Sequence, residues 1–259
     1  MLKIENTEVM GWEAAIRGMR NPMNSWEKSD SFCNPTRDNC NGCHDYNKCA
    51  YIFEESGKSY RSGIGPNDLD LMNRLRNSGT DHRKFMRMIT VYLDITAPLY
   101  WWKEFDTYKV GTVANSCSTM HKIADKEFTL EDFSCEHLFY DEDDMLKECY
   151  NYKNALNHTI QALNSARTHY LKTKDKKYWW QMNQLLPSSY NQRRTVMLNY
   201  EVLANIYKSR CNHKLDEWKD FCKWTKSLPY SELITGPDLS GIPICNEIIS
   251  EAKAKKGEQ

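Results

Sequence analysis

The sequence predicts an α+β protein, in which strands and helices occupy separate stretches of the chain. Two patterns carry this prediction. Apolar residues alternate with polar ones over residues 85–95, which is typical of a half-buried strand, and they recur every three or four positions from 141 to 170, which is typical of an amphipathic helix. The chain has 259 residues, of which 40% are hydrophobic. It is therefore long enough to bury a sizeable core in one large domain or two small ones.

The N-terminal part of the chain predicts a short strand and a helix within residues 1–30, followed by an irregular stretch. Residues 31–66 are rich in Cys, Asn, Gly, Ser and Pro, which are typical of loops, and a short helix is expected at 68–77. One face of the strand predicted at 85–95 is apolar except for Arg87, and its apolar members are Phe85, Ile89, Val91, Leu93 and Ile95.

The remaining stretches predict mainly helices. Pro98 suits the first turn of a helix at 99–109, and the polar run at 115–119 predicts a loop. Asp141 is a suitable N-cap for the long amphipathic helix, which extends over about 30 residues. Two further helices and a charged, fraying tail are expected at 191–209, 214–226 and 252–259.

Charge and hydropathy argue against several classes of protein. Thirty-five basic residues balance 35 acidic ones, so no net field attracts nucleic acid or a membrane surface, although a local patch stays open. Residues 1–5 lack the basic and apolar regions of a signal peptide, and no stretch approaches the ~20 apolar residues that span a bilayer. We therefore expect a cytoplasmic protein without a membrane partner, whose ten cysteines stay reduced.

Four of the cysteines lie close together in the irregular stretch, with the spacing Cys33-x6-Cys40-x2-Cys43-x5-Cys49. A Cys-x2-Cys pair allows two thiolates to reach one metal ion across a tight turn, and a glycine between them permits that turn. The first and last spacings are not those of a common zinc finger. Zinc, an iron–sulfur cluster and free thiols therefore remain as alternatives, and zinc at these four residues is the metal prediction.

Two windows of the sequence have the order and spacing of motifs found in one enzyme family. The first runs from Gly79-Thr-Asp-His82, through the predicted strand and helix, to Asn115-Ser-Cys-Ser118-Thr-Met120-His121. The second holds Leu186-Pro187, then Asn199-Tyr-Glu201-Val-Leu203-Ala-Asn205, and ends at Arg210. Together they resemble the signature stretches of the flavin-dependent thymidylate synthases. In that family a helix carries Gln and Arg-His-Arg, and a loop of the form Ser-x-Asn-Glu-x-Ser-x-Arg-Tyr follows.

Several positions keep the residue type that the resemblance assigns to a site. His82, Asn199 and Asn205 match residues that contact the flavin. Arg210 matches an arginine that binds the nucleotide, and Ser118 matches the loop serine if one residue is inserted. The catalytic candidates are thus Thr112, which keeps a hydroxyl, and Ser118; the cofactor-binding candidates are His82, Asn199, Asn205 and Lys109; the substrate-binding candidates are Glu104, Ser118 and Arg210.

Other positions have lost the family's arginines. Arg-His-Arg is replaced by Thr107-Tyr108-Lys109, the loop arginine by Met120, and the arginine of Asn-x-Arg by Glu201. Because arginine binds phosphate bidentately and lysine replaces only its point charge, the altered pocket is expected to bind dUMP poorly unless other cations take over. The cations nearest in sequence are Arg83, Lys84, Arg193 and Arg194.

The resemblance implies a single domain over residues 1–259, in which an antiparallel sheet packs on a helical core and residues 31–66 form a Cys-rich insert. It also implies FAD as cofactor, dUMP as substrate, a folate as one-carbon donor, and a homotetramer whose sites lie at subunit interfaces. The family chemistry uses no protein nucleophile, because reduced flavin supplies the hydride. Cys117 in the loop is then either a buried-type thiol or a reactive one whose neighbours His121 and Lys122 lower its pKa.

Three functions follow as hypotheses. The first is a flavin-dependent pyrimidine nucleotide methyltransferase, with an altered substrate if Glu104 accepts a hydrogen bond from the exocyclic amine of cytosine. The second is a catalytically inactive binding or assembly protein that retains the fold. The third is a nucleic-acid-binding module, against which the zero net charge argues. The tryptophan pairs at 101–102 and 179–180 serve either core and interface packing or stacking on a flavin or base.

Overall fold

The computed structural model describes residues 2–31, 63–139 and 151–236. The chain divides into two compact units, each built from separate stretches of sequence. Unit 1 comprises residues 1–8, 91–198 and 214–221, and unit 2 comprises residues 9–90, 199–213 and 222–259. The predicted Cys-rich insert, the start of the long helix at Asp141 and the charged tail lie outside the described residues.

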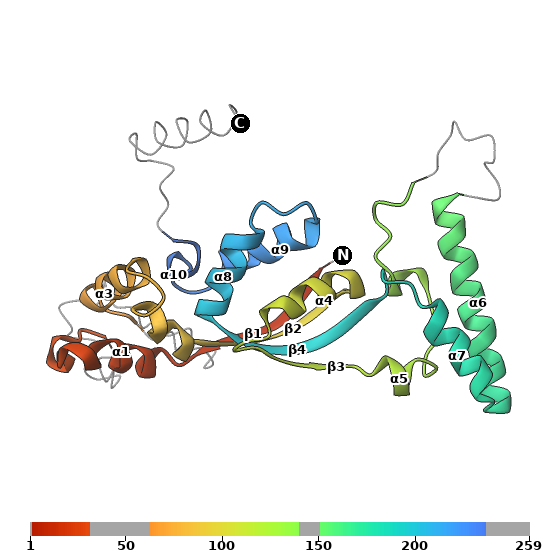
Figure 1. The fold of residues 1–259 in the computed structure, drawn as a ribbon, viewed down its shortest axis with the longest axis horizontal. Helices are drawn as coiled ribbons and strands as arrows, with labels where there is room; N and C mark the ends of the chain where they lie inside the picture. The colour runs from red at the N-terminus through yellow and green to blue at the C-terminus, as the bar shows by residue number, and fades with distance from the viewer. Residues whose placement is uncertain (1, 32–62, 140–150, 237–259) are drawn as a thin grey trace, which may run out of the picture. The chain divides into compact units, whose positions relative to one another are not determined.

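A four-stranded sheet forms the centre of unit 1 (Figure 1). Its strands lie in the order β1-β2-β4-β3. β3 runs antiparallel to β4, with Val113 opposite Met197 and Ser116 opposite Arg194. This mixture of helices and antiparallel sheet confirms the α+β prediction. The strands span Lys3–Met10 (β1), Thr90–Pro98 (β2), Val113–Ser116 (β3) and Asn191–Asn199 (β4).

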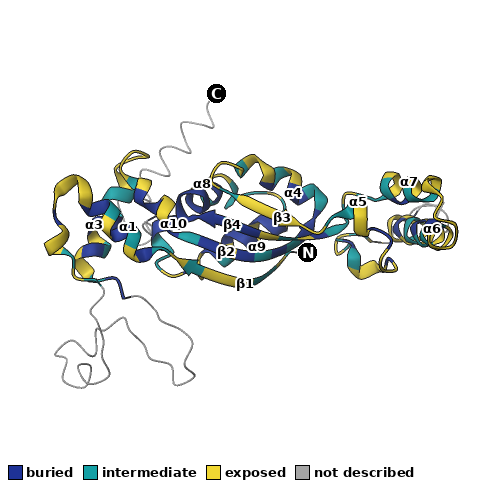
Figure 2. Cartoon of the chain, turned by 90° about the horizontal axis from the view of Figure 1, so that it is seen from below, coloured by how far each residue is buried: buried dark blue, intermediate teal, exposed yellow. Residues whose placement is uncertain are grey.

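One face of this sheet is buried beneath aromatic residues, and the buried residues of β2 and β4 are dark blue in Figure 2. Alternate residues of β2 and β4, such as Leu93 and Val196, are at most 1% exposed. α4, at Leu99–Phe105, and the first part of α9, at Asp216–Thr225, supply the aromatic cover. The rings of Trp101 and Trp218 lie 4.8 Å apart, and both side chains are fully buried. Burial of such large apolar surfaces is the main source of stability for this unit.

The other face of the sheet carries polar side chains that are bound to one another. Asp94 on β2 accepts hydrogen bonds from Asn6 Nδ2 at 2.7 Å, Arg193 Nη2 at 2.7 Å and Thr195 Oγ1 at 2.5 Å. The Thr195 hydroxyl, followed by Arg193 and Asn6, holds the pKa of Asp94 far below its ordinary value. This face is therefore ordered by hydrogen bonds between neighbouring strands, and it fixes the position of Arg193.

A helical hairpin completes unit 1 (Figure 1). α6 spans Tyr152–Thr173 and is capped by the Asn151 side chain, and α7 spans Lys176–Leu185. Lys174, in the left-handed region at φ 57°, and Asp175, whose side chain caps α7, make the tight connection. The hairpin has an apolar core of its own, formed by Leu156, Leu163, Ala166 and Met182 together with Phe128 and Phe133.

Helices make up most of the described part of unit 2. Its main elements are α1 (Trp12–Arg20), α3 (Pro66–Asn77), the 3₁₀ helix η4 (Arg83–Met88), α8 (Tyr200–Arg210) and α10 (Glu232–Thr235). Trp12 of α1 packs edge-on against Tyr200 and Tyr230, with ring centroids 5.2 Å apart in each case. The Tyr200 hydroxyl donates to the carbonyl of Pro229 at 2.6 Å, which satisfies its polar end inside this cluster.

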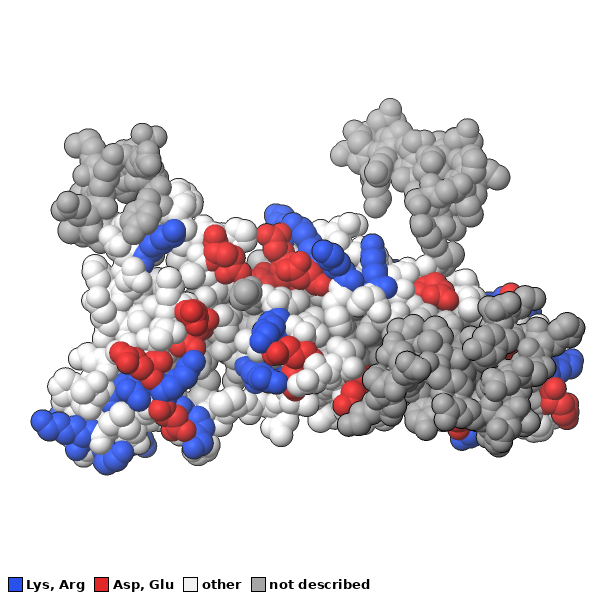
Figure 3. Space-filling model, turned by 180° about the vertical axis from the view of Figure 1, so that it is seen from behind, with Lys and Arg blue, Asp and Glu red and all other residues white. Residues whose placement is uncertain are grey.

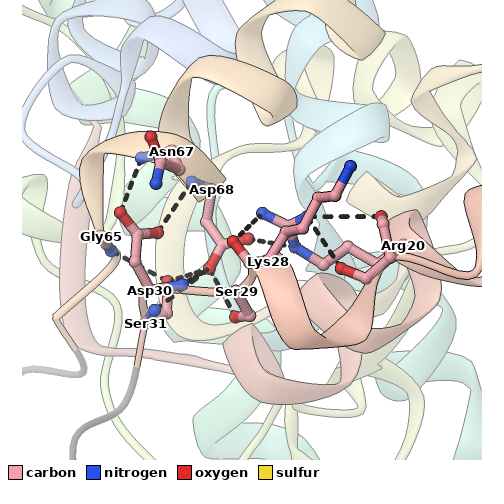
Figure 4. Close-up of polar contacts among 9 residues, drawn as sticks. Arg20, Lys28, Ser29, Asp30, Ser31, Gly65, Asn67 and Asp68 are labelled. Atoms are coloured by element: carbon pink, nitrogen blue, oxygen red, sulfur yellow. Dashed lines mark hydrogen bonds and ion pairs between the residues drawn. The ribbon is translucent and has the colours of Figure 1, made fainter.

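A buried ion pair fixes α1 against α3 (Figure 4). Arg20 and Asp68 are 4% and 0% exposed, and Arg20 Nε lies 2.6 Å from Asp68 Oδ1. Asp68 Oδ2 accepts from the hydroxyls of Ser29 and Ser31 at 2.7 and 2.6 Å, while Arg20 also donates to the carbonyls of Ser25 and Lys28. Because every polar side-chain atom of Arg20 and Asp68 has a hydrogen-bond partner, these bonds offset the desolvation cost of burying the ion pair.

The same network joins the two described ends that flank residues 32–62. The amide of Gly65 donates to Ser31 Oγ at 2.9 Å. The carboxylate of Asp30 accepts from the amides of Asn67 and Asp68, which begin α3. Residues 29–31 and 65–68 therefore lie side by side, as Figure 4 shows.

Three of the predicted elements are wrong in part. Residues 85–88 belong to η4 rather than to a strand, because Phe85 and Met86 are both buried and a strand cannot bury two adjacent residues on one face. Residues 191–199 form β4 rather than the start of a helix, and only 200–210 are helical. The predicted loop at 115–119 is confirmed only at 117–118, because Asn115 and Ser116 pair with β4 as the end of β3 and Thr119 begins α5 (Thr119–Lys122).

Other predictions agree more closely. The helices expected at 68–77 and 214–226 correspond to α3 and α9. The helix expected at 99–109 ends at Phe105 as α4 and tightens into a 3₁₀ turn at Asp106–Tyr108. The sequence gave no indication of α7. Within the described residues, no helix has both the length and the apolar character needed to cross a bilayer.

Candidate functional site

A cleft of about 510 Å³ lies in unit 1, between the polar face of the sheet and α5. Lys3 and Arg193 contribute from the strands, Cys117 and Ser118 from the loop after β3, and Lys122 from α5. A volume of this size suits a small molecule such as a mononucleotide. Three of the catalytic and substrate-binding candidates, Glu104, Thr112 and Ser118, belong to unit 1, and of these Ser118 lines the cleft.

Cations outnumber carboxylates in the lining of this cleft. It contains Lys3, Lys122, Lys126 and Arg193, against Glu131 and Asp132. Each cation has a carboxylate partner: Lys3 with Glu5 at 2.9 Å, Lys122 with Asp125 at 2.9 Å, Lys126 with Asp132, and Arg193 with Asp94 at 2.7 Å. The hydrogen bond to Asp125 raises the pKa of Lys122, so this ammonium group stays charged at neutral pH. The excess of cations favours binding of an anion, although the paired carboxylates weaken the positive potential of the cleft.

Hydrogen bonds hold the loop of the cleft against β4. The amide of Cys117 donates to the carbonyl of Arg193 at 3.2 Å, and Gln192 Nε2 donates to the carbonyl of Cys117 at 3.0 Å. Ser118 Oγ accepts from the amide of His121 at 3.3 Å and so caps α5. The thiol of Cys117 is exposed. The loop therefore presents fixed backbone and side-chain groups to whatever enters the cleft.

One polar atom of the lining has no partner. Asn191 Oδ1 is enclosed, and no hydrogen bond reaches it from the described residues. A buried acceptor without a donor costs about 1–3 kcal/mol.

The flavin candidates gather in unit 2. His82 is exposed at the start of η4, and its neighbour Arg83 donates from Nη2 to Asn205 Oδ1 of α8 at 2.9 Å. Asn199 is buried and caps α8 by accepting from the amide of Val202 at 3.0 Å. Arg210 lies in the last turn of α8 and has its own interactions. η4 and α8 thus bring residues 82–83 close to Asn205, whereas Asn199 has a structural role.

The acidic replacement Glu201 is neutralised by two arginines. It is 8% exposed on α8, and Arg87 binds it through two nitrogens, of which Nη2 lies 3.3 Å from Oε1. Arg83 Nε lies 3.5 Å from Glu201 Oε1, which is too long for a hydrogen bond, and this nitrogen is enclosed with no hydrogen-bond partner. Two arginines of η4 therefore offset the negative charge that Glu201 places on α8.

The remaining unit 1 candidates lie apart from the cleft lining. The carboxylate of Glu104 accepts from Trp218 Nε1 at 2.8 Å, which ties α4 to α9. Lys109 is exposed after the 3₁₀ turn, and Thr112 Oγ1 is enclosed without a hydrogen-bond partner among the described residues. Glu104 thus has a packing role that the sequence did not reveal.

Sequence proximity identified one of the cations of the cleft. Of the cations named in the sequence analysis, Arg193 lines the cleft. Arg194 points to the other face, where its guanidinium stacks 4.2 Å above Trp102 and binds Gln192 and Asp106. Lys122, Lys126 and Asn191 were missed. Lys122 follows Ser118 by four residues, a helical spacing that was the available signal for it, whereas nothing in the sequence indicated Lys126.

The predicted metal ligands Cys33, Cys40, Cys43 and Cys49 fall within 32–62, outside the described residues. In the parts of the chain that are described, no three His, Cys, Asp or Glu side chains come together in a way that suits a metal ion. The described cysteines, Cys117, Cys135, Cys211 and Cys222, are free thiols.

Comparison with known proteins relates the fold to nucleotide-methylating enzymes. No family model and no curated protein sequence matches the chain. Two structures of the flavin-dependent thymidylate synthase ThyX from Helicobacter pylori, with FAD and dUMP, share 14% identity and cover 91% of this chain and 98% of theirs, with a TM-score of 0.58. The UMP/dUMP methylase PolB from Streptomyces cacaoi, bound to 5-Br dUMP, shares 13% identity over 91% and 95% of the chains, with a TM-score of 0.52. Identity this low establishes a distant relationship of fold.

Proposed function

We propose that this chain is a flavin-dependent pyrimidine nucleotide methyltransferase that holds its nucleotide in the cleft beside Ser118. The observation that carries the proposal is the place of the cleft. It contains Ser118, the residue matched to the family's loop serine, and it is lined by four cations. The fold supports it, since proteins whose structures hold dUMP or 5-Br dUMP share it over 91% of this chain.

The cleft offers separate contacts for the two ends of a nucleotide. Lys122 supplies a point charge and Arg193 a guanidinium group for a phosphate, although their own carboxylate partners reduce the gain. The hydroxyl oxygen of Ser118 in the lining supplies an acceptor for an N–H group of the base. The imide of uracil and the amine of cytosine both carry such a donor, so the site is compatible with either base.

FAD is the proposed cofactor, and the polar groups of η4 and α8 are compatible with it. The exposed imidazole of His82 and the exposed carboxamide of Asn205 would contact the flavin. Bound flavin would supply the hydride of the reaction. The loss of the arginine at position 201 is offset by Arg83 and Arg87.

Binding of dUMP, UMP and dCMP, measured by isothermal titration, tests the nucleotide site. Lys122→Gln is expected to weaken binding about tenfold, because a charge-assisted contact contributes about 1.5–3 kcal/mol. Lys103→Gln is the matched control, since Lys103 is an exposed lysine on α4 that does not line the cleft. Absence of binding at millimolar concentration of all three nucleotides would contradict the proposal.

A second function, binding without catalysis, is favoured by Glu104 and Glu201. Both stand where the family has residues that contact ligands, and both are occupied within the protein, by Trp218 and by two arginines. The two functions differ in product formation. Methylation of the bound nucleotide, with reduced flavin and a folate one-carbon donor present, supports the enzyme. Tight nucleotide binding with no methylated product in mass spectrometry supports the binding protein.

Zinc at Cys33, Cys40, Cys43 and Cys49 remains part of the proposal as a structural metal. Metal analysis of the purified chain is expected to give about one zinc per chain. Iron together with acid-labile sulfide would indicate an iron–sulfur cluster instead. If the purified chain contains neither zinc nor iron, the four cysteines are free thiols.

A further inference from the structure

The end of the α6–α7 hairpin concentrates positive charge in a chain whose net charge is zero. Residues 166–181 contain Arg167, Lys172, Lys174, Lys176 and Lys177 but a single acidic residue, Asp175. Figure 3 shows Lys and Arg side chains gathered at this end of the hairpin. The segment lies outside the cleft described above.

The one carboxylate of the segment is already engaged. Asp175 Oδ1 accepts from the amide of Lys177 at 3.0 Å, and Oδ2 lies 3.1 Å from Lys177 Nζ. Arg167 donates to the carbonyl of Ala124 at 2.9 Å. In the described parts of the chain, Lys172, Lys174 and Lys176 have no carboxylate within ion-pair distance. In this respect they differ from the lysines of the cleft, each of which has one.

Aromatic rings lie directly beside these lysines. Lys174 Nζ is 5.6 Å from the ring of Tyr170, and Lys176 Nζ is 5.7 Å from Trp180 and 6.0 Å from Trp179. Lys177 Nζ lies 4.9 Å from Tyr178. Trp180 is 44% exposed, whereas tryptophan side chains are on average mostly buried. The exposed ring of Trp180 and the half-buried rings beside it lie among lysines without carboxylate partners, so the surface offers both stacking and phosphate contacts.

A hollow of about 540 Å³ runs beside this surface. Tyr170, Lys174, Lys176 and Trp179 line it from the hairpin, and residues of α5 line its other side. Trp179 Nε1 donates to the carbonyl of Met120 at 3.0 Å, and the tight turn at 174–175 fixes both helices. The indole of Trp179, which packs against Trp180, is therefore held in place before any ligand arrives, which lowers the entropic cost of binding.

We infer that the end of the α6–α7 hairpin binds single-stranded nucleic acid, with phosphates at Lys172, Lys174 and Lys176 and bases stacked on Trp180. Single strands fit better than duplexes because only unpaired bases expose faces to aromatic side chains. An acidic peptide would use the lysines but leave the rings without a stacking partner. The surface is independent of the proposed nucleotide site, whose residues are different.

Fluorescence anisotropy with a labelled oligothymidylate of about 16 nucleotides tests the inference. A triple variant, Lys172→Gln with Lys174→Gln and Lys176→Gln, is expected to weaken binding at least tenfold and to reduce its salt dependence by about two units of slope, since each phosphate contact contributes about 0.7. Trp180→Ala is expected to weaken binding about tenfold at unchanged salt dependence. The matched control changes the same charge at three exposed lysines elsewhere, Lys103, Lys208 and Lys223.

Three results would overturn the inference. The first is that the wild-type chain does not bind the oligonucleotide at low salt. The second is that the Lys172, Lys174 and Lys176 variant binds as tightly as the control variant of Lys103, Lys208 and Lys223. The third is binding to vesicles that contain phosphatidylserine without binding to the oligonucleotide, which would identify the surface as a site for lipid headgroups. Thermal unfolding of each variant shows that a loss of binding is not a loss of fold.

Discussion

Asp68 is the residue on which the packing of α1 and α3 depends most. Asp68→Asn leaves the buried guanidinium of Arg20 without its anion, so we expect a loss of about 3–5 kcal/mol in the free energy of unfolding. Denaturant unfolding followed by circular dichroism measures it. Asp70→Asn, on the exposed side of the same helix, is the control and is expected to change stability by less than about 0.5 kcal/mol. Equal effects of both variants would contradict the role of Asp68.

The same residue makes stability depend on pH. Burial alone would raise the pKa of Asp68, but hydrogen bonds from Ser29 and Ser31 and the charge of Arg20 outweigh burial and lower it below its ordinary value of 3.8. A lowered pKa in the folded state means that the unfolded state binds more protons in acid. The stabilisation is therefore present above about pH 4 and is lost as pH falls through the folded pKa. Unfolding titrations should show the difference between wild type and Asp68→Asn shrinking below pH 4.

Arg83 and Arg87 provide a matched pair for testing the flavin site. Both form an ion pair with Glu201, but Arg83 also bonds Asn205 and has an enclosed Nε without a hydrogen-bond partner. Arg83→Gln is expected to weaken FAD binding about tenfold, whereas Arg87→Gln changes it about twofold or less. Quenching of flavin fluorescence measures both affinities. If the two variants lose affinity equally, the effect comes from Glu201 and Arg83 has no contact of its own with the flavin.

At the scale of elements, Asn199 connects β4 to α8, and two substitutions separate its structural role from a ligand contact. Asn199→Ala removes the cap of α8 and is expected to cost about 1 kcal/mol of stability. Asn199→Asp keeps an oxygen that caps the helix equally well but removes the amide donor. Thermal unfolding and FAD titration of both variants distinguish the roles. A normal FAD affinity in Asn199→Asp would show that the asparagine serves the helix alone.

Element boundaries show where local pattern was sufficient. α3 and α9 were predicted because their apolar positions follow helical spacing and both begin and end at polar residues. β3 was missed because its four residues are all exposed, so that only backbone bonds to β4 define it. β4 was taken for the start of α8 because the two elements are continuous in sequence and both carry apolar residues.

At the scale of the whole molecule, the resemblance leads us to expect a homotetramer. Exposed apolar side chains such as Val113 (60%), Leu185 (45%) and Leu171 (41%) are available for contacts between copies. Light scattering after size exclusion is expected to give four times the mass of one chain, independent of dilution in the micromolar range. A monomer at all concentrations would contradict this expectation, and with it any site shared between subunits.

Sequence resemblance predicted the fold of this molecule better than it predicted the site. The match rests on order and spacing of motifs, and these follow from backbone architecture, which the comparison with ThyX supports at 14% identity. Individual contacts do not follow from spacing. Glu104 aligns with a ligand-binding glutamine, yet its carboxylate accepts from Trp218, 114 residues away in the chain.

The sequence by itself determined the α+β class, the helices with clear apolar periodicity and the placement of Ser118 and Arg193 as site candidates, because these depend on residues close together in the chain. Only the tertiary structure decided that Arg83 and Arg87 neutralise Glu201 and that Arg194 stacks on Trp102 while its neighbour Arg193 lines the cleft. Alternation along β4 sends adjacent arginines to opposite faces, and ion pairs form between segments that folding brings together. The charge of a site is thus set by partners that are distant in sequence.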